Sequence, residues 1–301
     1  MKESLSRIWQ VTASECCGSA RSRRVLVVML LYVVAAVACM AVVTNMLGKI
    51  EAELVKLMQL PASDHTGLVS AALWKSQHFR WIVENFVRDR LVFQDIVGRH
   101  PVELIYAWFA IMFSPMLAVL AASNRVSDDL RSGSARYVIV RVARIEWTLG
   151  KYFGQAAIIA VALAASAFGA WATAACMLSG VGAWDLLPAM FEWSARAGVC
   201  SLAWLGLVLG VSHVFRSASV ATTMCMVAIV LCSAWGPLLH FGAYKTGASW
   251  LLNLDALVPG GPAAAMWRRG LAPLVSGSIH LMVLGFFYLM IGHAIFRRRD
   301  A

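Results

Sequence analysis

The only long charged segment that is closely flanked on both sides by long apolar runs lies between positions 125 and 151. They are Arg125, Asp128, Asp129, Arg131, Arg136, Arg141, Arg144, Glu146 and Lys151. Carboxylate and guanidinium groups on one short segment suit charge-assisted hydrogen bonds with another protein. The same residues also fit a solvated basic loop at a membrane surface. The charge pattern alone favours neither interpretation.

The sequence contains no recognisable motif for catalysis, metal binding or ATP binding. Gly150-Lys151 is followed by Tyr152, and Ile145 occupies the position of the first glycine in GxxxxGK[ST], so there is no P-loop. The histidines lack HExxH spacing and the cysteines lack CxxC spacing. We therefore predict that the chain is not an enzyme and holds no cofactor or metal. If ATP drives it, another chain binds the ATP.

The composition is that of an integral membrane protein. Hydrophobic residues make up 60% of the 301 positions and charged residues only 14%. Soluble domains have about 45–50% apolar and roughly 25% charged residues. The net charge of +10 does not indicate a nucleic-acid partner, because Lys and Arg accumulate on the cytoplasmic flanks of membrane helices.

Six apolar runs are long enough to cross about 30 Å of hydrocarbon as helices. The predicted transmembrane helices are residues 25–46, 104–122, 152–178, 196–215, 218–239 and 274–296. The first run contains Ala36-Val37-Ala38-Cys39, which vaguely resembles a lipoprotein cleavage site. The run continues past Cys39 and exceeds the roughly 7–15 apolar residues of a signal peptide, which favours a membrane span.

The remaining segments complete an all-α membrane protein with a single transmembrane domain over residues 1–301. Residues 1–24 are interpreted as a helix on the membrane surface, with a disordered basic tail as the alternative. We expect a small helical insertion over 47–102 and a turn-rich loop over 179–195. The Gly- and Pro-rich residues 240–273 are predicted to form re-entrant or interfacial helices.

The distribution of charge predicts the orientation. With six spans, both termini lie on the same side of the membrane as residues 123–151. That side holds most of the basic residues: Lys2, Arg7, Arg21, Arg23, Arg24, Arg125, Arg131, Arg136, Arg141, Arg144, Lys151, Arg216, Arg297, Arg298 and Arg299. The bias places both termini in the cytoplasm and the segments 47–102 and 240–273 outside it.

Ionisable residues are scarce inside the predicted spans. His280 is the best candidate for a proton pathway, although a core histidine bonded to a backbone carbonyl is the commoner case. This scarcity argues against a proton-coupled transporter and against an intramembrane hydrolase. Gly206 and Gly210 form a GxxxG step, which more often marks close packing within a chain than a dimer seam.

Several features of residues 123–151 are similar to a known family. Asp128-Asp129 is followed by Gly133-Ser134, an amphipathic run over 136–140, Arg144, and Gly150-Lys151. This order resembles the type-2 permeases of ATP-binding-cassette (ABC) transporters, in which the segment links the second and third spans. Ser134 replaces the usual Thr, and no proline precedes Arg144, which leaves the turn at 142–143 poorly defined.

The resemblance implies a role for this segment as a cytoplasmic coupling helix, together with an N-terminal elbow helix. The residues that would couple to an ATPase are Asp128, Asp129, Arg131, Gly133, Arg136 and Arg144. Val138, Ile139, Val140 and Val142 would then pack beneath the spans. The implied partners are a cytoplasmic ABC ATPase, which carries ATP and Mg²⁺, a second permease subunit and the lipid of a bacterial inner membrane.

The expected function is therefore that of an ABC permease subunit, an exporter of a substrate that the sequence does not name. The smooth apolar spans suit lipidic or amphipathic cargo. The alternative is a non-transporting membrane scaffold that binds an extracytoplasmic partner through residues 47–102. Deleting residues 62–98 would abolish the scaffold function, whereas charge reversal at Asp129 or Arg136 would abolish the ATP-driven function.

Overall fold

The computed structural model describes residues 2–58, 74–77, 80–81, 83–84, 90–177 and 183–299. Every regular element in this part of the chain is a helix, which confirms the all-α prediction. Six helices are long and apolar enough to cross a membrane. They are α2 (Arg23–Met58), α6 (Pro101–Ala122), α9 (Arg144–Met177), α10 (Ala183–Ser212), α11 (Ala218–Thr246) and α13 (Leu271–Arg299).

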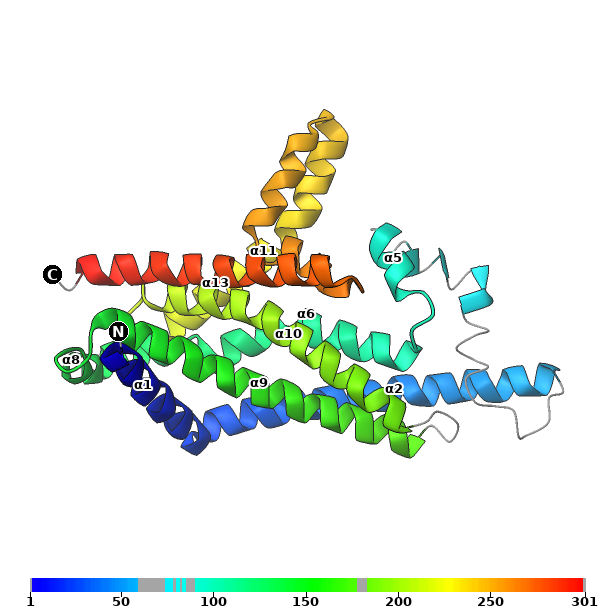
Figure 1. Ribbon diagram of the computed structural model, residues 1–301, viewed down its shortest axis with the longest axis horizontal. Coiled ribbons are helices and arrows are strands. Elements are labelled where there is room, and N and C mark those ends of the chain that lie inside the picture. The colour runs from blue at the N-terminus through cyan, green and yellow to red at the C-terminus, as the bar shows by residue number, and fades with distance from the viewer. Residues whose placement is uncertain are drawn as a thin grey trace.

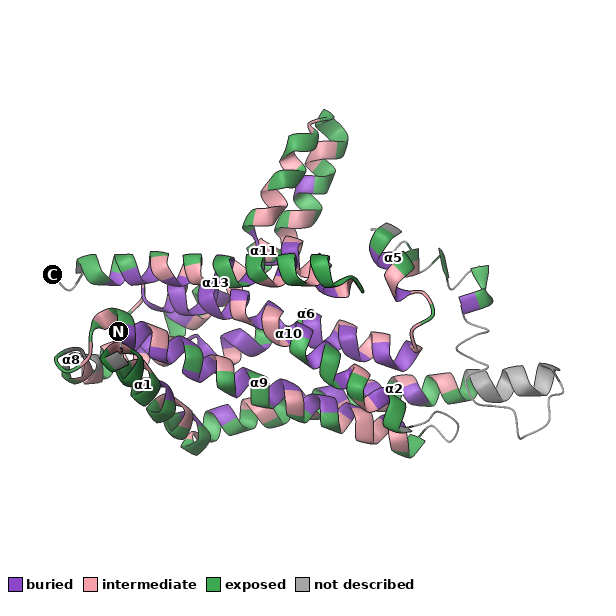
Figure 2. Ribbon diagram, in the orientation of Figure 1, coloured by how far each residue is buried: buried purple, intermediate pink, exposed green. Residues whose placement is uncertain are grey.

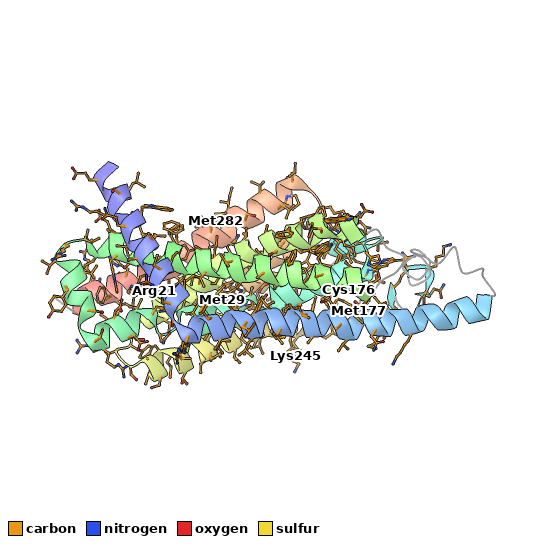
Figure 3. All side chains as sticks on the ribbon, turned by 90° about the horizontal axis from the view of Figure 1, so that it is seen from below. Arg21, Met29, Cys176, Met177, Lys245 and Met282 are labelled. Carbon is orange, nitrogen blue, oxygen red and sulfur yellow. The ribbon has the colours of Figure 1, made fainter. Side chains whose placement is uncertain are left out.

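Shorter helices lie at the two ends of this bundle. One end, here called the terminal end, holds both chain termini with α1 (Lys2–Arg21), α7 (Arg125–Ser132) and α8 (Ser134–Ile139) (Figure 1). The opposite, distal end holds α5 (Arg90–Ile96). Figure 3 shows Arg21 at the bend between α1 and α2, and Cys176 and Met177 at the far end of α9.

Four helix boundaries differ by more than three residues from the sequence-based expectation. Helix α11 continues to Thr246 rather than ending near residue 239, so it enters the segment expected to form re-entrant or interfacial helices. Helix α2 continues to Met58, so it extends into the segment assigned to the insertion. Helix α9 begins at Arg144 rather than near residue 152. The loop expected over 179–195 is wrong from Ala183 onward, where α10 begins. Leu186, Met190 and Trp193 are buried at helical spacing, and this packing outweighs the turn preference of the segment.

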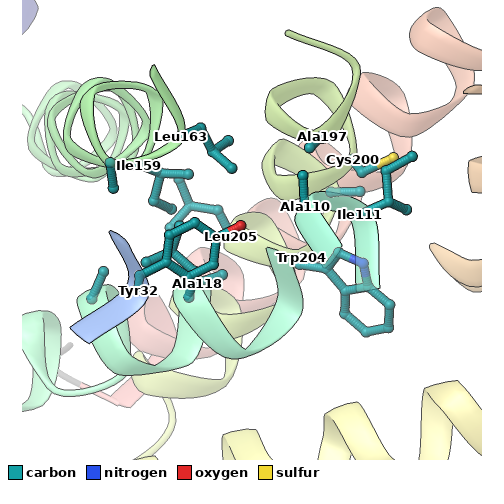
Figure 4. Close-up of a cluster of buried hydrophobic side chains, with 14 of the residues drawn as sticks. Tyr32, Ala110, Ile111, Ala118, Ile159, Leu163, Ala197, Cys200, Trp204 and Leu205 are labelled. Atoms are coloured by element: carbon teal, nitrogen blue, oxygen red, sulfur yellow. The ribbon is translucent and has the colours of Figure 1, made fainter. Parts of the chain in front are cut away.

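Helix α10 lies at the centre of the bundle and packs against α6, α9 and α13. Small and large side chains alternate in the core that these helices share, including Ala110, Leu163, Ala197 and Leu205 (Figure 4). The hydroxyl of Tyr106 donates to the Leu163 carbonyl over 3.3 Å, which satisfies a polar atom within this apolar cluster.

Glycines bring α10 and α13 into backbone contact. A Cβ atom added at Gly206 would lie 2.0 Å from the Gly285 carbonyl oxygen, and one at Gly210 would lie 2.5 Å from the Tyr288 carbonyl oxygen. A Cβ at Gly292 would in turn meet the Gly210 oxygen at 2.3 Å. Only glycine permits such an approach. The GxxxG step is therefore a contact within one chain, as predicted.

Helix α11 has few neighbours in the chain. Of the residues in its most apolar 18-residue stretch, 11% are buried inside the chain, against 67% for the corresponding stretch of α10. Figure 2 shows the difference in burial along the two helices. After α11, the 3-10 helix η1 (Ser249–Leu257) runs back beside it, and this hairpin projects away from the other helices (Figure 1). The chain returns through α12 (Gly260–Ala263) and η2 (Ala264–Trp267) to α13.

His280 Nε2 lies 2.9 Å from the Ala256 carbonyl oxygen of η1. The histidine is bonded to a carbonyl as expected, but it is exposed rather than in the core.

A charged cluster joins the elements of the distal end. The guanidinium groups of Arg99 and Arg196 both lie near the Trp193 ring, at 4.9 and 4.6 Å from its centroid. Its Nε1–H donates to Glu103 over 2.8 Å. Arg196 pairs with Glu192, as the four-residue spacing predicts. Because α10 begins at Ala183, this pair lies within the helix and not at its start.

The same cluster attaches the segment before α13 and helix α5 to the bundle. Arg196 Nη1 donates to the carbonyls of Met266 and Arg268 over 2.7 and 3.0 Å. Arg268 Nε donates to the Asp95 carboxylate over 2.8 Å, which connects η2 to α5. Val92, Phe93 and Ile96 of α5 form a small apolar cluster with Trp74, which packs against Leu104 of α6 and Trp267 of η2. This part of the predicted insertion is thus packed on the transmembrane helices.

Candidate functional site

Helices α7 and α8 form the predicted coupling segment at the terminal end (Figure 1). Gly133 joins them with φ +75°, in the left-handed region where a side chain is disfavoured. The Ser134 hydroxyl donates to the Asp129 carbonyl over 3.4 Å, so serine here makes a hydrogen bond that a threonine could also make. Gly133 therefore sets the bend between α7 and α8.

Asp128 stabilises the start of α7. Asn124 Nδ2 donates to its carboxylate over 2.8 Å, and the Asp128 backbone N–H donates to the Asn124 carbonyl over the same distance. Arg131 lies 3.9 Å from Asp128 in an exposed ion pair, with 74% of the arginine side chain accessible. An exposed pair of this kind is weak, so Arg131 remains accessible to a partner.

Asp129 points in the opposite direction, into the protein. Its carboxylate lies 2.7 Å from the Lys151 ammonium, and Glu15 of α1 lies 2.9 Å from the same ammonium. Gln155 Nε2 donates to the other Glu15 oxygen over 2.7 Å. Lys151 is 4% exposed. We call Glu15, Asp129, Lys151 and Gln155 the Lys151 junction. The Asp129 carboxylate, assigned from the sequence to a partner, thus contacts a residue of its own chain.

The junction depends on a close crossing of α1 and α9. A Cβ at Gly150 would lie 2.5 Å from the Val11 side chain, and one at Gly154 would lie 2.8 Å from Glu15. Thr12 Oγ1 donates to the Gly150 carbonyl over 3.3 Å, and Cys16 Sγ donates to the Gly154 carbonyl over 3.7 Å. Burial raises the pKa of the Cys16 thiol, aided by Cys17 and Glu15, which keeps it protonated for this bond.

Glu146 closes the turn in which the family's proline is missing. Its carboxylate accepts the Ala143 backbone N–H over 3.1 Å, three residues before it at the start of α9. This is one half of a capping box, in which a Glu at the third helical position satisfies the N–H of the cap residue. Arg141 and Val142 both donate to the Val138 carbonyl over 2.9 Å. The turn is therefore defined without proline.

Further contacts join the start of α9 to the ends of α10 and α13. The Thr148 hydroxyl is buried within 3.4 Å of His213 Nε2 and 3.0 Å of His293 Nδ1. The Arg144 guanidinium lies 5.7 Å from the Phe296 ring, and its Nη1 donates to the Arg297 carbonyl. Arg144, predicted to couple to an ATPase, therefore also contacts α13.

The outward surface of α8 and the following turn is partly apolar. Tyr137 is 81% exposed and Val140 is 87% exposed. Val138 packs partly against the core, as expected, but the prediction that Val140 packs beneath the spans is wrong. Residue 140 lies just past the end of α8, where the chain turns outward. Arg136 lies in α8, and the side chains of Arg136 and Ile139 are outside the described residues.

Sequence reasoning located the segment but not its internal partners. Asp128, Asp129, Arg131 and Gly133 lie together on α7 and at its C-terminal end, whereas Arg144 begins α9. The sequence assigns no partner to Glu15 or Glu146, and it identifies Lys151 only as a basic residue and as part of the Gly150-Lys151 pair. The one available signal was a pair of small residues, Gly150 and Gly154, next to a lysine within a predominantly apolar helix. A lysine in such a place needs an acidic neighbour.

Comparison with known proteins identifies the family. The model of the family described as "ABC-2 family transporter protein" matches residues 9–264, which covers α1 to the start of η2 and includes the whole coupling segment. No curated protein matches the chain. Members of this family are membrane components that work with a separate ATP-binding protein and are not themselves the ATPase. The six apolar helices agree with a multi-pass membrane protein. The chain therefore belongs to the ABC-2 transporter family.

Proposed function

We propose that this chain is the permease subunit of an ABC exporter and that α7 and α8 dock on its ATPase. The observation that carries the proposal is the geometry of the coupling segment. Its outer surface presents Arg131, Tyr137 and Val140, while its inner surface contacts α9 through Asp129. A short element that is accessible on one side and attached to long helices on the other is suited to transmit a partner's movement.

The proposed orientation places the terminal end in the cytoplasm of a bacterial cell, against the inner membrane. The concentration of basic residues at this end supports it. ATP and Mg²⁺ would bind to the ATPase, and this chain would hold neither. The exposed faces of the spans are apolar, which suits a lipidic or amphipathic substrate.

A second permease subunit completes the proposed assembly. Helix α11 is apolar along its length but packs little within the chain. Val230, Leu231 and Leu238 are all more than half exposed on it. A second copy placed against α11 would bury this surface, and lipid is the competing neighbour.

Co-purification of the tagged chain with an ATPase from its native membrane tests the proposal. Replacing Arg131 by Glu and Tyr137 by Asp should abolish the association, because both side chains lie on the accessible surface of the segment. The matched control is Arg298→Glu, which reverses an exposed charge at the same end but outside the segment. Asp129 is unsuitable for this test because its reversal would also disrupt the Lys151 junction.

Two results would contradict the proposal. One is substrate movement by the purified chain in vesicles without any ATPase. The other is full ATPase association by the double variant while Arg298→Glu behaves like the wild type. A scaffold function would instead be indicated if deletion of residues 62–98 abolished activity and the double variant retained it.

A further inference from the structure

Lys151 is the meeting point of three helices. Its ammonium group is on α9, 2.9 Å from Glu15 of α1 and 2.7 Å from Asp129 of α7. The Lys151 side chain is 5% exposed, Glu15 is 14% exposed and Asp129 is 34% exposed. One positive charge therefore separates two carboxylates in a mostly buried site. Buried charges are tolerated only when paired, so both carboxylates share this ammonium, and Glu15 has a further donor in Gln155.

The two carboxylates belong to elements that are held differently. Helix α1 crosses α9 at Gly150 and Gly154 in tight contact along much of its length. Helix α7 has only eight residues, too few to be stable as a helix without outside contacts. Its backbone continues from α6 through Asn124, and Asp129 lies one turn further along. The pair between Lys151 and Asp129 is thus a charged link from α7 to the α1–α9 unit.

We propose that Lys151 is a positioning residue that makes the elbow helix α1 move together with the coupling helix α7. The physical reason is the sharing of one cation. Movement of Asp129 displaces the ammonium, and the ammonium carries Glu15 with it. Without the ammonium, the two carboxylates face each other and repel. The transmission step rests on the proposed function, since it assumes that a partner moves α7. The ion-pair link from α7 to α1 and α9 does not depend on the proposed function.

Hydrogen exchange of the purified chain in lipid nanodiscs, without ATP, tests the link. In Lys151→Met, amide exchange should become at least about tenfold faster in both 8–19 and 125–132, because loss of a buried ion-pair partner raises the population of the open form. Lys151→Arg retains the charge and should restore protection in both peptides. Lys245→Met is the matched control, because Lys245 is exposed on α11, where its ammonium lies 4.9 Å from the Phe241 ring centroid.

A second variant keeps the test decisive if Lys151→Met fails to fold. Asp129→Asn removes the link to α7 and leaves the pair between Lys151 and Glu15. Exchange should then increase in 125–132 and stay unchanged in 8–19. Asp128→Asn is its control, since an asparagine at 128 can still accept from Asn124 Nδ2, and the exposed pair with Arg131 that it loses is weak. Unchanged exchange of 125–132 in Asp129→Asn, or an equal increase in Asp128→Asn, overturns the proposal.

Addition of ATP and vanadate to the complex with its ATPase tests the transmission step. In the wild type, exchange should change in 125–132 and 8–19 together, and in Lys151→Met it should change in 125–132 alone. A wild-type change confined to 125–132 overturns transmission through Lys151. If no ATPase associates with the chain, the proposed function and the transmission step both fail, while the ATP-free comparison still decides whether Lys151 links the helices.

Discussion

Single buried side chains hold the two ends of the bundle together. At the terminal end, Lys151 and Glu146 each satisfy groups from other segments. At the distal end, Arg196 and Asp95 do the same for the chain before α13 and for α5. A polar group that loses its only partner in a buried site costs more than the pair contributes. These residues are therefore where single substitutions should have clear and separate effects.

Replacing Glu146 by Ala should lower the unfolding temperature, because the start of α9 loses one half of its capping box. The carboxylate is the acceptor for the Ala143 N–H. Glu146→Gln is the matched control, because a glutamine at this position can accept the same hydrogen bond. Thermal unfolding in detergent measures both. Equal destabilisation by the two variants would mean that the charge pair with Arg7, and not the cap, supports the turn.

Asp95 should make the attachment of α5 dependent on pH. Burial raises the pKa of Asp95, but hydrogen bonds from Arg268 and Arg269 and their charges outweigh it, so the pKa lies below its usual value. A carboxyl group whose pKa is lower in the folded state contributes its full stabilisation of the fold at pH values above its unfolded-state pKa. That contribution is lost as the pH falls through its folded-state pKa. The stability difference between wild type and Asp95→Asn should therefore be largest near neutral pH and vanish in acid.

Unfolding midpoints measured across the acid range decide this prediction. Asp185→Asn, an exposed acidic residue near the start of α10, provides the comparison. A stability difference for Asp95→Asn that stays constant from neutral to acid pH would show that its carboxylate charge contributes nothing to the attachment of α5.

Helix pairs in this bundle meet in two ways. Where α10 crosses α13, glycines allow backbones to touch, and where α1 crosses α9, glycines make room for the side chains of Val11 and Glu15. Elsewhere, as between α6 and α10, larger side chains fill the space between the helices. Interiors are packed to the density of organic crystals, so a glycine contact tolerates no added atoms. The first kind of pair should be intolerant even of alanine.

Replacing Gly206 by Ala should destabilise the chain by about 1–3 kcal/mol, the range for overpacking a filled contact. The added methyl group would lie 2.0 Å from a backbone oxygen of α13, which no side-chain rotation can relieve. Gly48→Ala in α2 is the control, because nothing lies within 4 Å of its added Cβ. That variant should be neutral or slightly stabilising, since alanine favours the helix. An unfolding midpoint for Gly206→Ala at or above that of the wild type would contradict the backbone contact between α10 and α13.

The whole molecule has one central helix and one peripheral one. Helix α10 is surrounded by α6, α9 and α13, whereas α11 and η1 project from the bundle (Figure 1). A projecting apolar helix must be covered by lipid or by another protein. The proposed function favours a second copy of the chain, and this choice can be tested without knowing the substrate.

Oxidative cross-linking of Leu231→Cys in native membranes should yield a disulfide-linked dimer. Two copies paired at α11 would place equivalent residues near their symmetry axis, and a disulfide forms only when the two Cα atoms are within about 7 Å. Val161→Cys on α9 is the control, because it is similarly exposed but on another helix. The absence of dimer from Leu231→Cys, or equal dimer from Val161→Cys, would indicate that lipid covers α11.

Much of the architecture could be predicted from the sequence. Apolar runs such as 218–239 and 274–296 are long enough that any folded arrangement must place them in a membrane, and they correspond to α11 and α13. Gly133, identified in the sequence only through the resemblance to the family, lies at the bend between α7 and α8, where the left-handed backbone favours glycine. The coupling segment and the family followed from such local features.

The sequence by itself therefore determined the membrane class and the six spans, and it located the proposed coupling segment, because hydropathy and turn preference depend on neighbouring residues. Only the tertiary structure decided which charges are paired. Glu15 and Lys151 are 136 residues apart in sequence, and only the crossing of α1 and α9 brings them within 2.9 Å. The same crossing decides that Asp129 faces inward and that Arg131 stays accessible. Burial depends on packing between distant segments, and no local pattern encodes it.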